Sequence, residues 1–194
     1  MKVFKNELEV VQSFESALER FGERLAAAGD DSWGAPTPCS EWDVRALVNH
    51  VVSELAWIPP LLDGKHIADV GDRLDGDLLG DDPPAAWRQV ARDALVAAST
   101  EGAPERTVHL SAGDASADRY LAEVTADVVV HTWDLARSIG ADERLDPTLV
   151  EFAEATLRPL IDSWRAAGLL GYEIELPEIA DRQTALLALL GRRA

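Results

Sequence analysis

The sequence has a single cysteine, few basic residues and no long apolar run. Because Cys39 is the only cysteine, the chain cannot form an intramolecular disulfide, and a hydrophobic core must stabilise the fold. The 18 lysines and arginines are outnumbered by 35 acidic residues, which gives a formal net charge of −17. No basic cluster could follow a phosphate backbone. We therefore expect neither a nucleic acid nor an anionic membrane as a partner.

Two further absences bear on location and size. No apolar segment reaches the length of about 18 residues that a membrane-spanning helix needs. The first residues, "MKVFKNELEV", lack the apolar centre of a signal peptide. We expect a soluble, cytoplasmic protein. A length of 194 residues favours one domain over 1–194, with a core at about 6–140 and a C-terminal extension at about 146–194.

Apolar residues recur every three or four positions in several segments, which is the pattern of helices that pack on other helices. The first segment runs from Asn6 to Gly29. The second begins where Ser40 can cap a helix with Asp43 at the capping-box position, and it ends near Pro59 and Pro60. The remaining predicted helices cover 83–98, 117–139 with Gly140 as the closing residue, 146–164, and part of the tail 181–194.

The connections between these helices indicate the architecture. Residues 63–84 are rich in glycine and aspartate without a sustained period, which predicts a long surface connection. Such a connection suits a helical bundle with a crossover rather than simple hairpins. The stretch "ERTVHLSAGDAS" predicts a small β-hairpin or an extended arm, too short to found a sheet. The fold class is therefore all-α: a four-helix bundle with a crossover and additional C-terminal helices.

One predicted helix carries unusual polar residues, in the stretch "ADVVVHTWDLARSIG" at 126–140. At about 100° per residue, His131 lies beside the centre of the apolar stripe, with Asp127 and Asp134 roughly 40° and 60° from it. In the second helix, His50 lies just off the apolar stripe and Glu54 follows one turn later. All of these side chains can reach the space between helices.

If the two helices face each other, His50, Asp127 and His131 supply two nitrogens and one carboxylate to a single point. This donor set suits a borderline divalent cation such as Zn²⁺, and three protein ligands leave a position open for water or substrate. The i, i+4 spacing of Asp127 and His131 places both side chains on one face of their helix.

Structural explanations of the same residues stay open. His131 can be a hydrogen-bonded core histidine with Asp134 as its partner, and Glu54 can be a solvated or salt-bridged side chain. Cys39 has no recognisable base or orienting partner, which favours a small buried residue. His66 and His109 lack ligand spacing, and we assign them no role.

Several motifs resemble one protein family. They are "TPCSEWDVRALVNHVV" (37–52), "DRLDGDLLGDDPPAAW" (72–87), "RTVHLSAGD" (106–114), "ADVVVHTWDLARSIG" (126–140) and "LLALLGRR" (186–193). Together they resemble the actinobacterial proteins related to mycothiol-dependent maleylpyruvate isomerase, within the DinB-like superfamily. The resemblance implies a DinB-like bundle that holds a divalent metal through His50, Asp127 and His131. The family carries glutamate where this chain has Asp127, and its isomerases have a longer C-terminal domain.

The resemblance gives three functional hypotheses. The first is a metal-dependent enzyme of the thiol-linked isomerase or transferase kind, which acts on a small molecule with Zn²⁺, or as second choice Ni²⁺, and with mycothiol. Glu54 and Asp134 are then the candidates for proton transfer or for orienting a ligand histidine. The second is a non-catalytic module that binds a metal or small ligand, and the third is a purely structural polar seam. Trp57 and Trp133 lie off their apolar stripes, which is compatible with a homodimer contact or with packing inside one chain.

Overall fold

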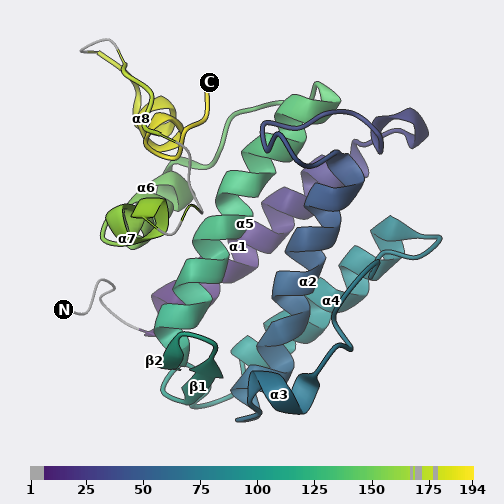
Figure 1. The fold of residues 1–194 in the computed structure, drawn as a ribbon, viewed down its shortest axis with the longest axis vertical. Helices are drawn as coiled ribbons and strands as arrows, with labels where there is room; N and C mark the ends of the chain where they lie inside the picture. Colours follow the sequence, from purple (N-terminus) through teal and green to yellow (C-terminus); the bar gives the residue numbers. More distant parts are fainter. Residues whose placement is uncertain (1–6, 167, 169–171, 177–178) are drawn as a thin grey trace.

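The computed structural model describes residues 7–166, 168, 172–176 and 179–194 (Figure 1). Asn6 and the rest of the stretch 1–6 lie outside the described residues. The helices and strands are α1 (Glu7–Ala26), the 3-10 helix η1 (Asp30–Ser32), α2 (Val44–Leu62), α3 (Ile67–Val70), α4 (Pro83–Ala98), β1 (Thr107–Leu110), β2 (Gly113–Ser116), α5 (Ala117–Ile139), α6 (Pro147–Leu157), α7 (Ile161–Ala166) and α8 (Arg182–Leu189).

Four long helices form the bundle. α5 packs along α1 and α2, and α4 packs along the same two helices from the other side. α1 and α2 therefore lie diagonally across the bundle, as do α4 and α5 (Figure 1). Their apolar faces make one continuous core, in which Phe21 of α1 packs against Trp87 of α4 with tilted rings and centroids 4.5 Å apart. The predicted four-helix bundle is confirmed.

The connection between α2 and α4 is the predicted crossover. After the short helix α3, the chain returns along α2 toward its beginning. Asn49 donates to the Gly76 carbonyl at 2.9 Å and accepts from the Leu78 N–H at 2.8 Å, and Arg45 contacts Asp77 at 2.7 Å. α4 therefore starts beside the start of α2, and the two helices run in the same direction (Figure 1).

Two predicted ends of α2 are wrong. The N-cap is Asp43, whose carboxylate accepts from the Ala46 N–H at 2.8 Å, and Ser40 lies in the preceding turn. Asp43 is held at this place because Pro36 and Asp43 form an isolated β-bridge. At the other end, α2 continues through Pro59 and Pro60 to Leu62, since the last turn buries apolar side chains against the core.

The predicted hairpin is present, while the extended arm is not. β1 and β2 pair antiparallel, with Thr107 opposite Ser116 and Leu110 opposite Gly113. α5 begins directly after β2 and ends at Gly140, which adopts φ 69° in the left-handed region that glycine tolerates best. The predicted bounds of α5 are therefore confirmed.

The C-terminal helices pack beside the bundle, with α6 against α5 and α1, and α8 against α6 (Figure 1). The helix predicted over 146–164 is divided in two, because the Leu160 N–H bonds to the Leu157 carbonyl in a tight turn between α6 and α7. Trp133 is buried and Trp57 packs against the core, which confirms packing inside the chain. Among the described residues, no helix has the length and apolarity needed to cross a membrane.

Candidate metal centre

One face of α5 carries the polar residues singled out in the sequence. Asp127, His131 and Asp134 lie on successive turns of this face, and His131 and Asp134 are 5% and 0% exposed in a core that is mostly apolar. α2 packs against α5 and brings His50 to the same place. The predicted inward direction of His131 and the predicted meeting of the two helices are both observed.

His50, Asp127 and His131 converge on one point. The His50 Nε2 lies 3.2 Å from the Asp127 Oδ2, and the His131 Nε2 lies 3.4 Å from the Asp127 Oδ1. One ligand atom from each residue lies within 4.8 Å of the other two. In a tetrahedral Zn²⁺ site with bonds of 2.0–2.2 Å, neighbouring ligand atoms are about 3.3–3.6 Å apart. The donor types and their separations therefore fit a divalent metal.

The charges at this point stabilise one another. Burial alone would raise the pKa of Asp127, but the charge and hydrogen bonds of His131 and His50 hold it well below its usual range. Burial alone would lower the pKa of His131. The charge of Asp127, together with the hydrogen bonds that His131 makes to Asp127, Asp134 and Cys39, raises this pKa well above its usual value. Asp127 is therefore an ionised carboxylate at neutral pH, as a metal ligand must be.

Glu54 adds a second acidic group beside this point. Burial, and then the charge of Asp127, raise the pKa of Glu54, while the two imidazoles partly oppose the shift. Burial, and then the charge of Glu54, raise the pKa of Tyr120 of α5. The Tyr120 hydroxyl is buried without a hydrogen-bond partner among the described residues. A carboxyl with a raised pKa can hold a proton closer to neutral pH than an exposed glutamate can.

An aromatic side chain that the sequence reasoning missed covers the two histidines. The Trp42 ring lies 4.7 Å from the His50 ring and 5.8 Å from the His131 ring, measured between centroids. Trp42 precedes the N-cap of α2, so the turn before that helix positions it. Trp42 lies within the motif at 37–52, and this was the sequence feature from which its role could have been predicted.

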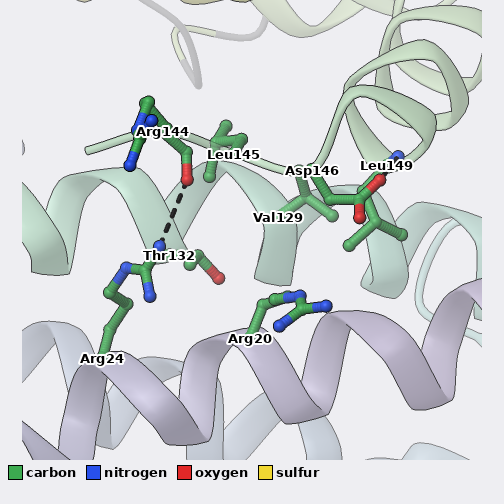
Figure 2. A pocket seen from close by; sticks show the side chains of 8 residues that line it. All are labelled: Arg20, Arg24, Val129, Thr132, Arg144, Leu145, Asp146 and Leu149. Carbon is green, nitrogen blue, oxygen red and sulfur yellow. Dashed lines mark hydrogen bonds between the residues drawn. The ribbon is translucent and has the colours of Figure 1, made fainter. Parts of the chain in front are cut away.

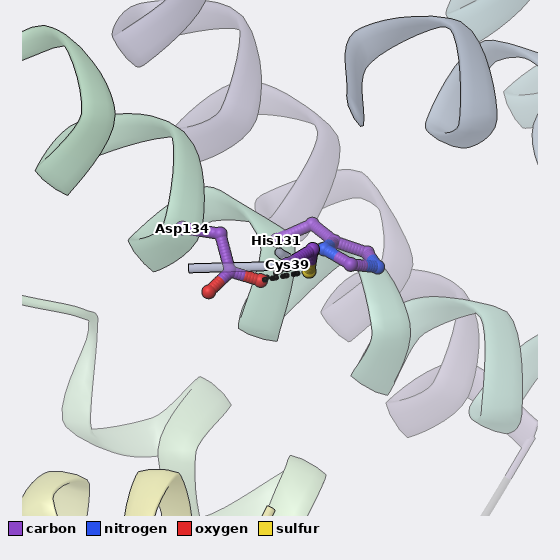
Figure 3. Close-up of side chains that lie close together, drawn as sticks. All are labelled: Cys39, His131 and Asp134. Carbon is purple, nitrogen blue, oxygen red and sulfur yellow. Dashed lines mark hydrogen bonds and ion pairs between the residues drawn. The ribbon is translucent and has the colours of Figure 1, made fainter. Parts of the chain in front are cut away.

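A second cluster lies on the other side of the His131 ring. The His131 Nδ1–H donates to the Asp134 Oδ2 at 2.9 Å, and the Cys39 Sγ lies 3.7 Å from the same oxygen (Figure 3). Figure 3 shows the three side chains close together beside α5. Arg192, which follows α8, reaches this cluster with its Nη2 2.8 Å from the Asp134 Oδ2 and 3.5 Å from the Cys39 Sγ.

Arg192 distinguishes the two candidate metal sites. Cys39, His131 and Asp134 also have ligand atoms within 4.8 Å of one another. However, the Arg192 guanidinium already places a cation against the Asp134 carboxylate, and two cations would compete for it. At the centre made by His50, Asp127 and His131, the described residues place no arginine or lysine against the Asp127 carboxylate, and an imidazole can lose its proton when a metal binds, so this centre is the better candidate.

The other two histidines lie away from this centre, at the hairpin end of the bundle. His66 before α3 and His109 in β1 form an isolated bridge, and their rings stack with centroids 4.1 Å apart. His109 also contacts Asp114 at 2.8 Å. Neither belongs to a ligand cluster among the described residues.

A pocket between α1, α5 and the segment before α6 has no connection with this chemistry. Arg20, Arg24 and Arg144 line it, and the Arg24 Nη2 donates to the Arg144 carbonyl at 3.2 Å (Figure 2). The cavity volume is about 10 Å³, which is about the space of one water molecule. This pocket is too small for a substrate.

The profile of the family described as mycothiol maleylpyruvate isomerase N-terminal domain matches residues 14–136. The chain belongs to this family. The match includes His50, Asp127 and His131, but it ends before α6 and therefore before Arg192. The resemblance expected from the sequence motifs is confirmed.

Relatives of the chain include two proteins of Mycobacterium tuberculosis, from strains CDC 1551 and H37Rv, both named as uncharacterized. Each is 29% identical over 154 residues, which is 79% of this chain and 80% of the relative. The crystal structure of a histidine-to-alanine mutant of mycothiol-dependent maleylpyruvate isomerase superposes with a TM-score of 0.59 and 14% identity, over 87% of this chain and 74% of that chain. The helical, DinB-like fold of the isomerase is thus shared.

Proposed function

We propose that this protein is a metal-dependent enzyme of the thiol-linked isomerase or transferase kind, acting on a small molecule. The observation that carries the proposal is the convergence of the two Nε2 atoms of His50 and His131 on the Asp127 carboxylate at 3.2 and 3.4 Å. Membership of the isomerase family supports mycothiol as the thiol. Zn²⁺ is the metal that the donor set favours, with Ni²⁺ second.

The metal would be held by His50, Asp127 and His131, where it would supply a Lewis acid for a thiol or a carbonyl oxygen. Asp127 is one methylene shorter than the glutamate of the family. The 3.2 and 3.4 Å contacts support its reaching the same point as the two imidazoles.

Three further side chains have roles in the proposed centre. Asp134 accepts the Nδ1–H of His131 and so directs the Nε2 of this ring toward Asp127. Because hydrogen bonds from His131 and Arg192 lower the pKa of Asp134 against the effect of burial, Asp134 stays ionised and orients rather than transfers protons. Glu54, whose pKa is raised, is the candidate proton carrier. Trp42 covers the two imidazoles and limits the access of water.

The first test is metal content. Protein purified without a His-tag or chelator is analysed by inductively coupled plasma mass spectrometry, together with His50→Ala, His131→Ala and the control His109→Ala. We expect near-stoichiometric metal in the wild type and in His109→Ala, and a loss in the other two. Circular dichroism checks that all variants are folded. A wild type that stays metal-free after incubation with zinc would favour the structural polar seam.

The second test separates an enzyme from a binding module. The Co²⁺-substituted protein is titrated with mycothiol, and its visible spectrum is recorded; maleylpyruvate and other electrophilic small molecules are then assayed for thiol-dependent turnover. A spectral change on addition of thiol, followed by turnover, is the expected result. A metal-loaded protein whose spectrum does not change on addition of thiol, and which turns over none of these molecules, would support the non-catalytic module instead.

A further inference from the structure

The turn after α8 is fixed by backbone hydrogen bonds and by one buried side chain. The Gly191 N–H bonds to the Ala188 carbonyl at 3.0 Å and the Arg192 N–H to the Leu187 carbonyl at 2.8 Å, which close the end of α8. Gly191 takes φ 79°, a value that permits this turn. Leu190 is 4% exposed and belongs to the hydrophobic core. The backbone that carries Arg192 is therefore held on both sides of the turn.

The Arg192 side chain holds both oxygens of Asp134. Its Nε lies 2.8 Å from the Oδ1 and its Nη2 lies 2.8 Å from the Oδ2. These two parallel contacts make the bidentate arrangement that guanidinium and carboxylate groups favour. The side chains are only 13% and 0% exposed. Since both oxygens are held, the Asp134 carboxylate cannot rotate without breaking a buried charged contact.

This restriction passes to His131. The Asp134 Oδ2 that Arg192 holds is the atom that accepts the Nδ1–H of His131 at 2.9 Å. The proton on Nδ1 and the plane of the ring then leave Nε2 facing Asp127 at 3.4 Å. A carboxylate free to rotate would offer the ring several orientations, whereas a fixed one offers a single orientation.

We propose that Arg192 is a positioning residue for the candidate metal centre, which it completes from outside the matched family domain by fixing Asp134 and, through it, the His131 ring. This inference rests on the proposed metal site, and it deepens that proposal by including the C-terminal segment. Among the described residues, no hydrogen bond or ion pair joins Arg192 to a proposed metal ligand, so it acts through Asp134.

The test compares Arg192→Met with Arg192→Lys and with the control Arg193→Met. Arg193 is the exposed neighbour, so its substitution changes the net charge equally without touching Asp134. Zinc affinity is measured by competition with a chromophoric chelator. We expect Arg192→Met to weaken zinc binding about tenfold, the lower part of the range for residues that orient a ligand. Arg192→Lys should weaken it less, because the charge stays but the paired contact does not.

A second readout does not depend on metal. Long-range ¹H–¹⁵N spectra of the metal-free protein report the protonation and the hydrogen bonding of each ring nitrogen of His131. We expect the Nδ1–H signal of His131 to shift or to broaden in Arg192→Met, because the hydrogen bond to Asp134 is no longer fixed, and to stay unchanged in Arg193→Met. In an Asp134→Asn background, Arg192→Met should cause no further loss of zinc affinity, because both changes act through one group.

The outcomes separate the two proposals. A wild type that binds no zinc refutes the proposed function, while the metal-free spectra still decide the role of Arg192. An Arg192→Met protein with wild-type zinc affinity and an unchanged His131 spectrum overturns the inference. If Arg192→Met does not fold, Arg192→Lys decides instead: wild-type affinity and spectrum in that variant would equally overturn it.

Discussion

Replacing Asp134 by asparagine tests the energetics of the buried cluster. Asp134 is fully buried and pairs with Arg192, which is 13% exposed, and with His131, which is 6% exposed. Removing one member of a buried ion pair costs about 3–5 kcal/mol, because the remaining charge is left uncompensated. Asparagine keeps the shape of the aspartate side chain and one of its acceptor oxygens, so we use the lower end of this range. We expect the free energy of unfolding to fall by about 3 kcal/mol.

The assay is urea unfolding followed by circular dichroism, with a chelator present so that bound metal does not add to stability. With a slope of about 2 kcal/mol per molar urea, the midpoint should fall by about 1.5 M. The matched control is Asp142→Asn, which removes a carboxylate from an ion pair with Arg144 whose side chains are 49% and 87% exposed. We expect no measurable shift of the midpoint in this control.

Two results would refute the reasoning. A midpoint shift in Asp134→Asn as small as that in Asp142→Asn would mean that the buried cluster contributes no more than a surface pair. The double variant Asp134→Leu with Arg192→Met gives the second result. Since apolar residues of similar size can replace a buried pair at little cost, it should be more stable than Asp134→Asn. A double variant less stable than Asp134→Asn would contradict the charge argument.

Further predictions concern positions away from the metal centre. Hydrogen bonds from Arg158 and Arg182 lower the pKa of Glu154 below its usual range, so this contact between α6 and α8 should stabilise the protein at neutral pH and be lost as pH falls through the lowered pKa. Thermal unfolding at pH 7 and pH 3 should therefore show a smaller pH dependence in Glu154→Gln than in the wild type. Gly140→Ala should cost about 1 kcal/mol in urea unfolding because φ is 69° there, and an unchanged midpoint would contradict this strain. Phe14→Ala, at a fully buried position of α1, should cost about 3–5 kcal/mol, to be measured in the same assay against the exposed Val96→Ala.

The convergence of the three candidate ligands was predictable because they lie on two regular helices. The periodicity of α5 fixes the direction of His131, and the i, i+4 spacing brings Asp127 to the same face. Only the facing of α2 and α5 had to be assumed to add His50. Local patterns therefore predicted the three candidate ligands together with the bounds of α5.

The cluster around Arg192 could not be predicted in this way. Arg192 meets Asp134 across 58 positions of the sequence and Cys39 across 153. No periodicity connects a tail residue with a helix face at such a separation. The ends of α2 were misplaced for a related reason: the bridge between Pro36 and Asp43 and the burial of Leu62 are tertiary effects that override local capping and proline rules.

The diagonal arrangement of the bundle also determines when the centre can exist. Because α1 and α2 lie across the bundle from each other, as do α4 and α5, consecutive long helices do not all pair as simple hairpins. The contact between α1 and α5 can form only after α5 has been synthesised, and such non-local pairing slows folding. His50 likewise meets Asp127 and His131 only once α5 has docked. The candidate metal centre therefore forms with the completed bundle, and metal binding at these three residues would report that folding has finished.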